Sequence, residues 1–195
     1  MRFFQQLIET HGLADFQADW PKQADDPTGG YTKFGRYLRG IGVSSSFIAN
    51  VRRIVVSGDH DDDESFERIC RQLVAAGYKA PQAPKEFIST EGKPDISILL
   101  LPEDSTGCLE TMCYTAACVK WPHIQTPLEN YMASTPADTW RPNKRDKARI
   151  HCVLASTCEQ RPDVSLQDLW HQDGEFHIPL NAQAFQGIVQ FLTSS

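Results

Sequence analysis

The chain has 195 residues, of which 41% are hydrophobic and 23% charged, and its formal net charge is −6. Domains usually contain about 100–200 residues, so this length predicts one domain, or one domain with an appendage. The excess of 25 Asp and Glu over 19 Lys and Arg excludes a globally basic surface of the kind that drives non-specific DNA binding, but leaves room for a local basic patch.

The composition also predicts where the protein resides. No stretch reaches the ~18 apolar residues needed to span a bilayer, and the first residues lack the apolar core and cleavage site of a signal peptide. The six cysteines form no Cys-x-x-Cys pair, which favours reduced thiols over a zinc site or a disulfide framework. We therefore expect a cytoplasmic protein that does not associate with membranes.

The first two predicted elements are helices. Apolar residues recur at helical spacing over residues 3–8, and Gly12 is a stop signal. A loop rich in Asp, Pro and Gly follows and ends in Gly29-Gly30. The apolar spacing over residues 31–41 then predicts a second helix.

Two predicted strands flank the third helix. Residues 53–57 are a β-branched run bounded by Gly58, which predicts a buried strand. The apolar spacing over 66–74 predicts a helix that ends at Gly77, and residues 96–101 predict a second buried strand. The order strand, acidic turn, helix, strand is a βαβ unit, so the predicted sheet is parallel and covered by helices.

The rest of the chain is predicted to be largely helical. The expected elements are a helix after Thr106-Gly107, a proline-punctuated stretch to Pro142, a helix through residues 150–154 and a last helix over 182–192. We therefore predict an α/β fold with one domain over residues 1–160, and a helical C-terminal extension over residues 161–195 packed on it.

An acidic cluster directly follows the first predicted strand. Ligands of parallel sheets bind at the carboxyl ends of the strands, where we expect Asp59 and Asp61. Two carboxylates at alternate positions can point the same way and share a hard cation such as Mg²⁺. The alternative is a solvated acidic turn in which Asp63 or Glu64 caps the next helix, and composition alone favours it.

Two familiar motifs fit this cluster poorly. An EF-hand starting at Asp59 requires Gly and Glu where the chain has Glu64 and Cys70. Haloacid-dehalogenase phosphatases usually follow Asp-x-Asp with x-Thr or x-Val, where the chain has Asp63.

A second acidic segment follows the second predicted strand. If that strand lies beside the first in a parallel sheet, its carboxyl end is close to Asp59 and Asp61, and Glu110 faces them from the first turn of a helix. The alternative is that Glu110 only complements the helix dipole.

Taken in order, these segments resemble Toprim-like proteins. The matching pieces are the hydrophobic strand, Asp59-x-Asp61, a helix ending in Gly77-Tyr78, a strand followed by Pro102, and Gly107-x-Leu109-Glu110. The likeness is to small uncharacterised relatives of the OLD (overcoming lysogenization defect) nucleases and covers residues 1–160. Gly29-Gly30 before a helix and the basic run at 144–149 also fit.

The resemblance implies a fold and an activity. The fold is a Toprim-like, Rossmann-like, mostly parallel sheet covered by helices, and the activity is magnesium-dependent phosphoryl transfer on nucleic acid. By position, Asp59 and Asp61 match the Asp-x-Asp of the family, Glu110 the additional Glu of OLD-like members, and Lys147 the lysine that follows it there.

These assignments imply a cofactor and partners. Asp59, Asp61 and Glu110 would hold Mg²⁺ or Mn²⁺, and two such cations ~3.5–4 Å apart stabilise the attacking and leaving oxygens of a phosphodiester. Lys147 would neutralise charge that develops in the transition state. The expected substrate is DNA or RNA, the expected setting is prokaryotic defence, and the expected ATPase partner is a separate chain because no Walker motif is present.

The resemblance is incomplete at the amino terminus. Family members begin with a strand ending in Glu-Gly-x-x-Asp, whereas Met1 already stands at the start of the aromatic-rich helix and Glu9 falls inside it. Two explanations compete. Either the chain is truncated and the native protein has a complete site, or the protein is shortened and is a catalytically degenerate binding module. A weaker alternative is a phosphatase that uses Asp59 as its nucleophile.

One segment is densely basic. Residues 141–149 hold five Arg and Lys residues against Asp146. Local positive charge of this kind suits a phosphate-backbone contact, and the alternative is a solvated helix start.

Overall fold

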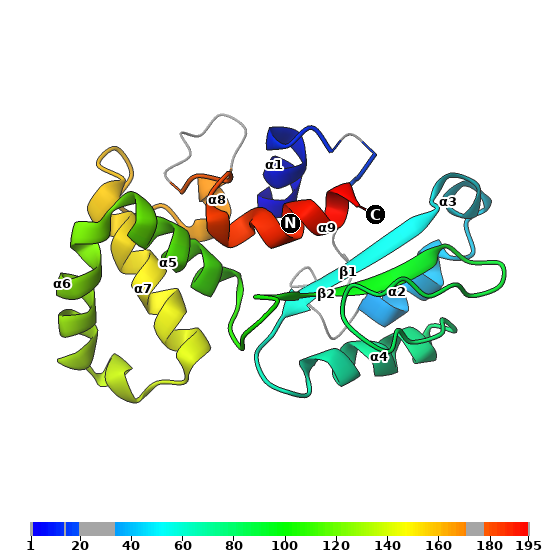
Figure 1. The fold of residues 1–195 in the computed structure, drawn as a ribbon, viewed down its shortest axis with the longest axis horizontal. Coiled ribbons are helices and arrows are strands. Elements are labelled where there is room, and N and C mark those ends of the chain that lie inside the picture. Colours follow the sequence, from blue (N-terminus) through cyan, green and yellow to red (C-terminus); the bar gives the residue numbers. More distant parts are fainter. Residues whose placement is uncertain (1, 14, 20–33, 171–177, 195) are drawn as a thin grey trace. The chain divides into compact units, whose positions relative to one another are not determined.

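A computed structural model describes residues 2–13, 15–19, 34–170 and 178–194 (Figure 1). Gly29-Gly30 and the start of the second predicted helix lie outside the described residues. The chain forms two compact units, which we call the helical unit (Met1–Ala18 with Gly107–Ser195) and the α/β unit (Asp19–Thr106). Each is described by itself. The sequence predicted a domain over residues 1–160 and an extension over 161–195. This division differs from the bounds of the two compact units and stays a prediction.

The α/β unit is built around two parallel strands. Strands β1 (Arg53–Asp59) and β2 (Asp95–Leu101) pair in register from Arg53 opposite Asp95 to Asp59 opposite Leu101. Helix α4 (Ser65–Ala75) connects them, so the βαβ prediction is confirmed. The fold is therefore mixed α/β with a small parallel sheet. Two further helices, α2 (Phe34–Ile41) and α3 (Ser45–Asn50), precede β1, and α3 was not predicted.

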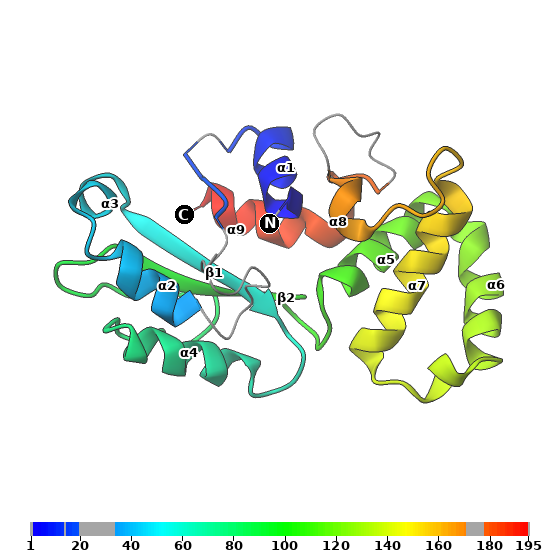
Figure 2. The same cartoon turned by 180° about the vertical axis from the view of Figure 1, so that it is seen from behind.

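The core of this unit lies between the sheet and two helices. Helices α2 and α4 lie on the same face of the sheet (Figures 1 and 2). The buried residues there come from α2, α4, the turn after α4, and alternate positions of β2: Phe34, Leu38, Ile69, Leu73, Ala76, Tyr78, Ile96, Ile98 and Leu100. β2 is buried from Ile96 to Leu101, as predicted. β1 is only half-buried, so the prediction that it is a buried strand is wrong.

Two glycines permit the packing of α4. A Cβ atom on Gly35 of α2 would lie 2.9 Å from the backbone oxygen of Gln72, so only glycine allows α2 and α4 to approach this closely. Gly77 has a φ of 78° and ends α4, which is the stop that the sequence predicted.

Three helices of the helical unit form one packed group. Helices α5, α6 and α7 pack together, and α7 runs beside α5 (Figures 1 and 2). Their bounds are Leu109–Lys120, Pro122–Ala133 and Pro142–Thr157. Short 3₁₀ helices cover Pro136–Thr139 and Gln183–Phe185, and the remaining helices are α1 (Arg2–Thr10), α8 (Leu166–Leu169) and α9 (Gln186–Thr193).

An aromatic cluster joins the two ends of the chain within the helical unit. The ring of Phe3 in α1 lies edge-on to Trp170, at 5.5 Å between centroids, and 5.1 Å from Phe185. Phe3, Trp170 and Phe185 are all buried. The first helix was predicted, and its burial comes from residues at the opposite end of the sequence.

A polar network connects α5, α6 and α7. Thr111 Oγ1 donates to Asp146 Oδ2 at 2.6 Å, and Arg149 Nη1 donates to Asp146 Oδ1 at 2.6 Å. Arg149 Nη2 and the Tyr114 hydroxyl both donate to the carboxylate of Glu129, at 2.6 and 2.8 Å. Asp146 is 7% exposed, and these donors supply the hydrogen bonds that its carboxylate needs away from water.

None of the helices in the described ranges is both long and apolar enough to cross a membrane.

Candidate functional site

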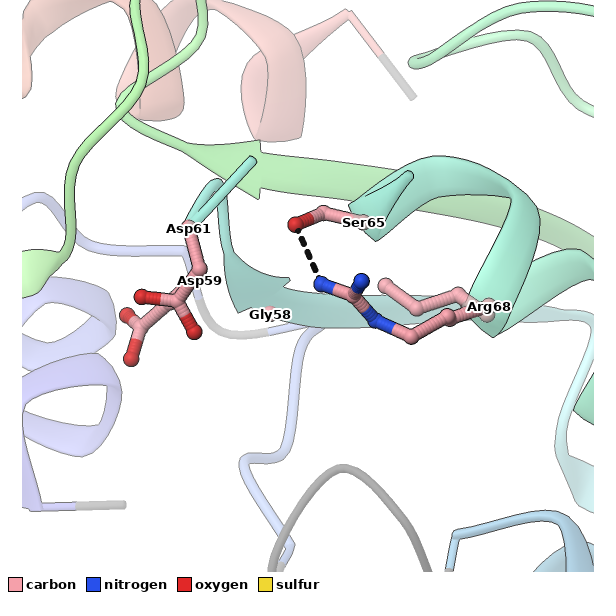
Figure 3. A pocket seen from close by; sticks show the side chains of 6 residues that line it. Gly58, Asp59, Asp61, Ser65 and Arg68 are labelled. Carbon is pink, nitrogen blue, oxygen red and sulfur yellow. Dashed lines mark hydrogen bonds between the residues drawn. The ribbon is translucent and has the colours of Figure 1, made fainter. Parts of the chain in front are cut away.

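Asp59 and Asp61 lie together at the carboxyl end of β1. Asp59 is the last residue of the strand and pairs with Leu101, the last residue of β2. Both aspartates line one small pocket, together with Gly58, Ser65, Arg68 and Ile69. Figure 3 shows the two carboxylates turned to the same side of the strand end, away from Arg68. This is where the βαβ topology was predicted to place them.

Close packing between strand and helix forms one wall of the pocket. A Cβ atom on Gly58 would lie 3.1 Å from Ile69 Cδ1, a tight contact. The absence of a side chain at Gly58 therefore lets the first turns of α4 lie against the end of β1. This contact sets Ser65 and Arg68 beside Asp59 and Asp61.

His60 ties the acidic turn to the segment after β2. Its backbone N–H donates to Leu101 O at 2.9 Å, and its ring Nδ1 lies 3.1 Å from Pro102 O. His60 is not among the residues that line the pocket. These contacts fix the turn that carries Asp59 and Asp61.

Asp62 orders the turn that leads into α4, whose N-cap residue is Glu64. Its Oδ1 accepts from Glu64 N at 3.0 Å and from Ser65 Oγ at 3.3 Å, whereas Glu64, at the cap position, makes no side-chain cap bond. Glu64, one of the two expected residues, therefore holds the cap position, but its side chain makes no capping hydrogen bond to the helix. The hydrogen bond from Arg68 holds the pKa of Asp62 below its ordinary value, and the N–H of Glu64 adds to this effect.

Among the described residues that line the pocket, Arg68 is the cationic one. Its Nη1 donates to Asp62 Oδ2 at 3.1 Å, its Nη2 donates to Ser65 Oγ at 3.0 Å, and Nη2 lies 2.9 Å from Asp62 Oδ1. Sequence reasoning missed it. The available signal was helical spacing, because Arg68 follows Ser65 by three positions and lies on the same face of α4.

Another acidic side chain of the α/β unit, Glu103, lies after β2, and the sequence analysis did not single it out. Glu103 stands two residues after Leu101, and its Oε2 lies 2.5 Å from Lys85 Nζ. Lys85 has a left-handed backbone with a φ of 65°, and its N–H donates to Ile98 O at 2.8 Å. The Glu103 side chain is 14% exposed, so Lys85 neutralises a largely buried carboxylate.

Glu110 and Lys147 belong to the helical unit and lie close to each other. Glu110 is in the first turn of α5, Lys147 is on α7, and Lys147 Nζ lies 4.0 Å from Glu110 Oε1. This placement of Glu110 also suits its alternative role at the positive end of the helix dipole. The prediction that Glu110 and Lys147 act together with Asp59 and Asp61 stays a prediction.

Ion pairs among the described residues involve three of the five basic residues in the segment 141–149. Arg149 binds Asp146 and Glu129, Arg145 lies 3.7 Å from Asp138, and Lys147 pairs with Glu110. The remaining two basic residues, Arg141 and Lys144, are exposed at the start of α7. The alternative of a solvated helix start therefore describes Arg141 and Lys144, and Lys147 is exposed as well.

The pocket suits a hard cation that brings some of its own ligands. Asp59 and Asp61 offer carboxylate oxygens, which Mg²⁺ and Mn²⁺ prefer. Across the described ranges, no three His, Cys, Asp or Glu residues are grouped closely enough to hold a metal ion. A cation on two carboxylates would complete its coordination with water or substrate phosphate oxygens, as Mg²⁺ commonly does.

Comparison with known proteins places both units in one family. No curated protein and no solved structure matches the chain. The family described as "Protein of unknown function (DUF3226)" matches residues 1–194. This range includes the pocket residues and residues from both chain segments of the helical unit. The chain therefore belongs to the DUF3226 family.

Proposed function

We propose that this protein is a magnesium- or manganese-dependent phosphoryl-transfer protein that cleaves nucleic-acid phosphodiesters through a Toprim-like α/β unit. The observation that carries the proposal is the position of Asp59 and Asp61 in one pocket at the carboxyl end of a parallel strand. Parallel sheets bind ligands at this edge, and paired carboxylates are the usual way to bring a divalent cation to a phosphate.

The connectivity of the α/β unit supports a Toprim-like fold. The Asp-x-Asp begins at the last residue of one strand, α4 packs on the sheet, and the second strand is parallel and adjacent. Gly77-Tyr78 ends the helix segment and Pro102 follows the second strand, as in the Toprim-like pattern that the sequence resembles. These elements occur along the chain in the same order as in the Toprim-like pattern.

The chemistry follows from the charges in the pocket. Asp59 and Asp61 would hold the cation, and the close packing of Gly58 against Ile69 keeps the turn that carries them against α4. The bound cation would neutralise a phosphate oxygen and lower the pKa of a coordinated water. The hydrogen bonds of His60 to the segment after β2 keep the two aspartates in place during the reaction.

The test is a nuclease assay with the full chain on single-stranded and duplex DNA and on RNA, with Mg²⁺, with Mn²⁺ and with EDTA. We expect cation-dependent cleavage that Asp59→Asn and Asp61→Asn each reduce by about 100-fold or more. The matched control is Asp63→Asn, an exposed acid of the same turn that does not line the pocket, which should retain activity. Thermal unfolding of each variant shows whether it is folded.

The same assay tests the remaining assignments. Glu110→Gln and Lys147→Met should reduce cleavage if these residues are the predicted third carboxylate and the charge-neutralising lysine. Cleavage that survives Asp59→Asn would contradict the proposal. Cation-independent binding without cleavage would identify the binding module, and a phosphoenzyme trapped on Asp59 would identify the phosphatase.

A further inference from the structure

We infer that Arg68 binds the substrate phosphate in the pocket that Asp59 and Asp61 line, an inference that rests on the proposed function and names a phosphate-binding residue for it. Arg68 comes from the second turn of α4, whereas the aspartates come from the end of β1 and the turn after it. Figure 3 shows the guanidinium over the strand end, with the two carboxylates beyond it.

The guanidinium is held in one orientation before any ligand arrives. Asp62 binds it through both terminal nitrogens, at 3.1 and 2.9 Å, and Ser65 Oγ accepts from it at 3.0 Å. Ser65 itself is 3% exposed and donates to Asp62, so the support is anchored in the protein. A guanidinium carries five N–H donors in a planar fork that matches phosphate oxygens, and fixing it in advance reduces the entropy lost on binding.

Beside the cation, the pocket needs hydrogen-bond donors for the phosphate. Two carboxylates repel a phosphodiester, and a single divalent cation only balances them. Arg68, the cationic member of the lining among the described residues, shares its charge with Asp62, so it would add directed N–H donors for the phosphate oxygens rather than a net positive charge. Its side chain is 26% exposed, so it is accessible to a ligand and still partly shielded from solvent.

A purely structural role for Arg68 makes a different prediction. If Arg68 only supports Asp62 at the start of α4, its loss lowers stability and leaves substrate affinity unchanged. Arg71 is the matched control, because it is an exposed arginine one turn further along the same helix and does not line the pocket. Its replacement removes the same charge from the same helix.

The experiment compares Arg68→Gln, Arg71→Gln and Asp59→Asn in the full chain. Cleavage of a labelled single-stranded DNA oligonucleotide with Mg²⁺ gives KM and kcat, and Mn²⁺ binding measured by electron paramagnetic resonance reports on the cation site. We expect Arg68→Gln to lower kcat/KM by about tenfold or more, mainly through KM, with Mn²⁺ affinity unchanged. Asp59→Asn should lose Mn²⁺ binding, and Arg71→Gln should stay within about twofold of the wild type.

The outcomes separate this inference from the proposed function. If the wild type cleaves and Arg68→Gln behaves like Arg71→Gln, the role of Arg68 is wrong and the proposed function stands. If Arg68→Gln lowers only the melting temperature, Arg68 is structural and the inference is again wrong. If the wild type neither binds Mn²⁺ nor cleaves, the proposed function fails and the role of Arg68 fails with it.

Discussion

Lys85 has a φ of 65°, a conformation that costs a residue other than glycine about 1–2 kcal/mol. Two contacts offset this cost: the hydrogen bond of its N–H to Ile98 O, and the 2.5 Å ion pair between its Nζ and Glu103. Glu103 is the more buried partner, with 14% of its side chain exposed against 41% for Lys85. The pair therefore matters mainly because Glu103 needs a counter-charge at the end of the sheet.

We predict that Lys85→Met destabilises the protein by about 1–3 kcal/mol, because it leaves the Glu103 carboxylate largely buried without its cation. Urea unfolding measures the change. Adding Glu103→Gln to Lys85→Met should recover most of the loss, since the uncompensated charge is then gone. Lys79→Met, at an exposed lysine of the same unit, is the control, and an equal effect of Lys79→Met and Lys85→Met would contradict the prediction.

Individual site residues were predictable from sequence only where a topological rule applies. Asp59 and Asp61 lie at the carboxyl end of a strand, and the rule that parallel sheets bind ligands at this edge places them without knowledge of any partner. Glu103 and Lys85 depend on a contact between two loops, and Arg68 depends on the position of Asp62 in the turn before α4. Such contacts arise from turn geometry, which residue spacing does not determine.

Among the elements, Arg149 links α7 to Glu129 of α6, and Thr111 and Tyr114 of α5 donate to Asp146 and Glu129 of the same network. Burial alone would raise the pKa of Glu129, but the hydrogen bonds from Arg149 and Tyr114 outweigh it and hold the pKa below the ordinary value. The stabilisation from a carboxylate with a lowered pKa is fully present above the pKa of the unfolded state. It is lost as the pH falls through the lower, folded-state pKa.

We therefore predict that part of the acid sensitivity of this protein comes from Glu129. At pH 7, Glu129→Gln should cost about 1 kcal/mol, a modest value because the Glu129 side chain is 38% exposed. The difference between wild type and Glu129→Gln should shrink as the pH is lowered below 4.5, the ordinary glutamate value. Urea unfolding at several pH values measures it. Glu159→Gln, at an exposed position, is the control, and a difference that grows on acidification would overturn the prediction.

Elements with a clear period were predicted well, and those with irregular composition were not. The two strands and α4 carry β-branched or helical patterns and lie where these indicate. α6 holds Pro122 at its start and Pro127 inside it, so the sequence indicated only a proline-punctuated helical stretch. The half-burial of β1 depends on what packs against it, which its own β-branched run does not reveal.

For the whole molecule, the division into two units depends on contacts that no local pattern contains. Phe3 packs on Trp170 and Phe185, so the first helix joins the last part of the chain in the helical unit. Hydrophobic periodicity predicts that Phe3 is buried but gives no information about its partner. The sequence consequently predicted a boundary near residue 160, whereas the compact units of the structure meet at residues 18–19 and 106–107.

The net charge of −6 makes nucleic-acid binding dependent on divalent cations under the proposed function. An acidic protein repels a phosphate backbone, and each bound cation both reduces that repulsion and offers a direct ligand to phosphate. We predict that adding Mg²⁺ to EDTA-treated protein raises its affinity for a labelled oligonucleotide by about tenfold or more, measured by fluorescence anisotropy.

Asp59→Asn should abolish this increase and bind as the wild type does in EDTA, whereas Asp63→Asn should retain it. Because the proposed pocket engages only about one or two phosphates, the logarithm of the binding constant should fall with that of the salt concentration at a slope shallower than about −2. Equal affinity with and without the cation would contradict the prediction. A steep salt slope in EDTA would instead show that exposed basic residues such as Arg141 and Lys144 bind the backbone directly, so that the net charge of the whole chain does not limit binding.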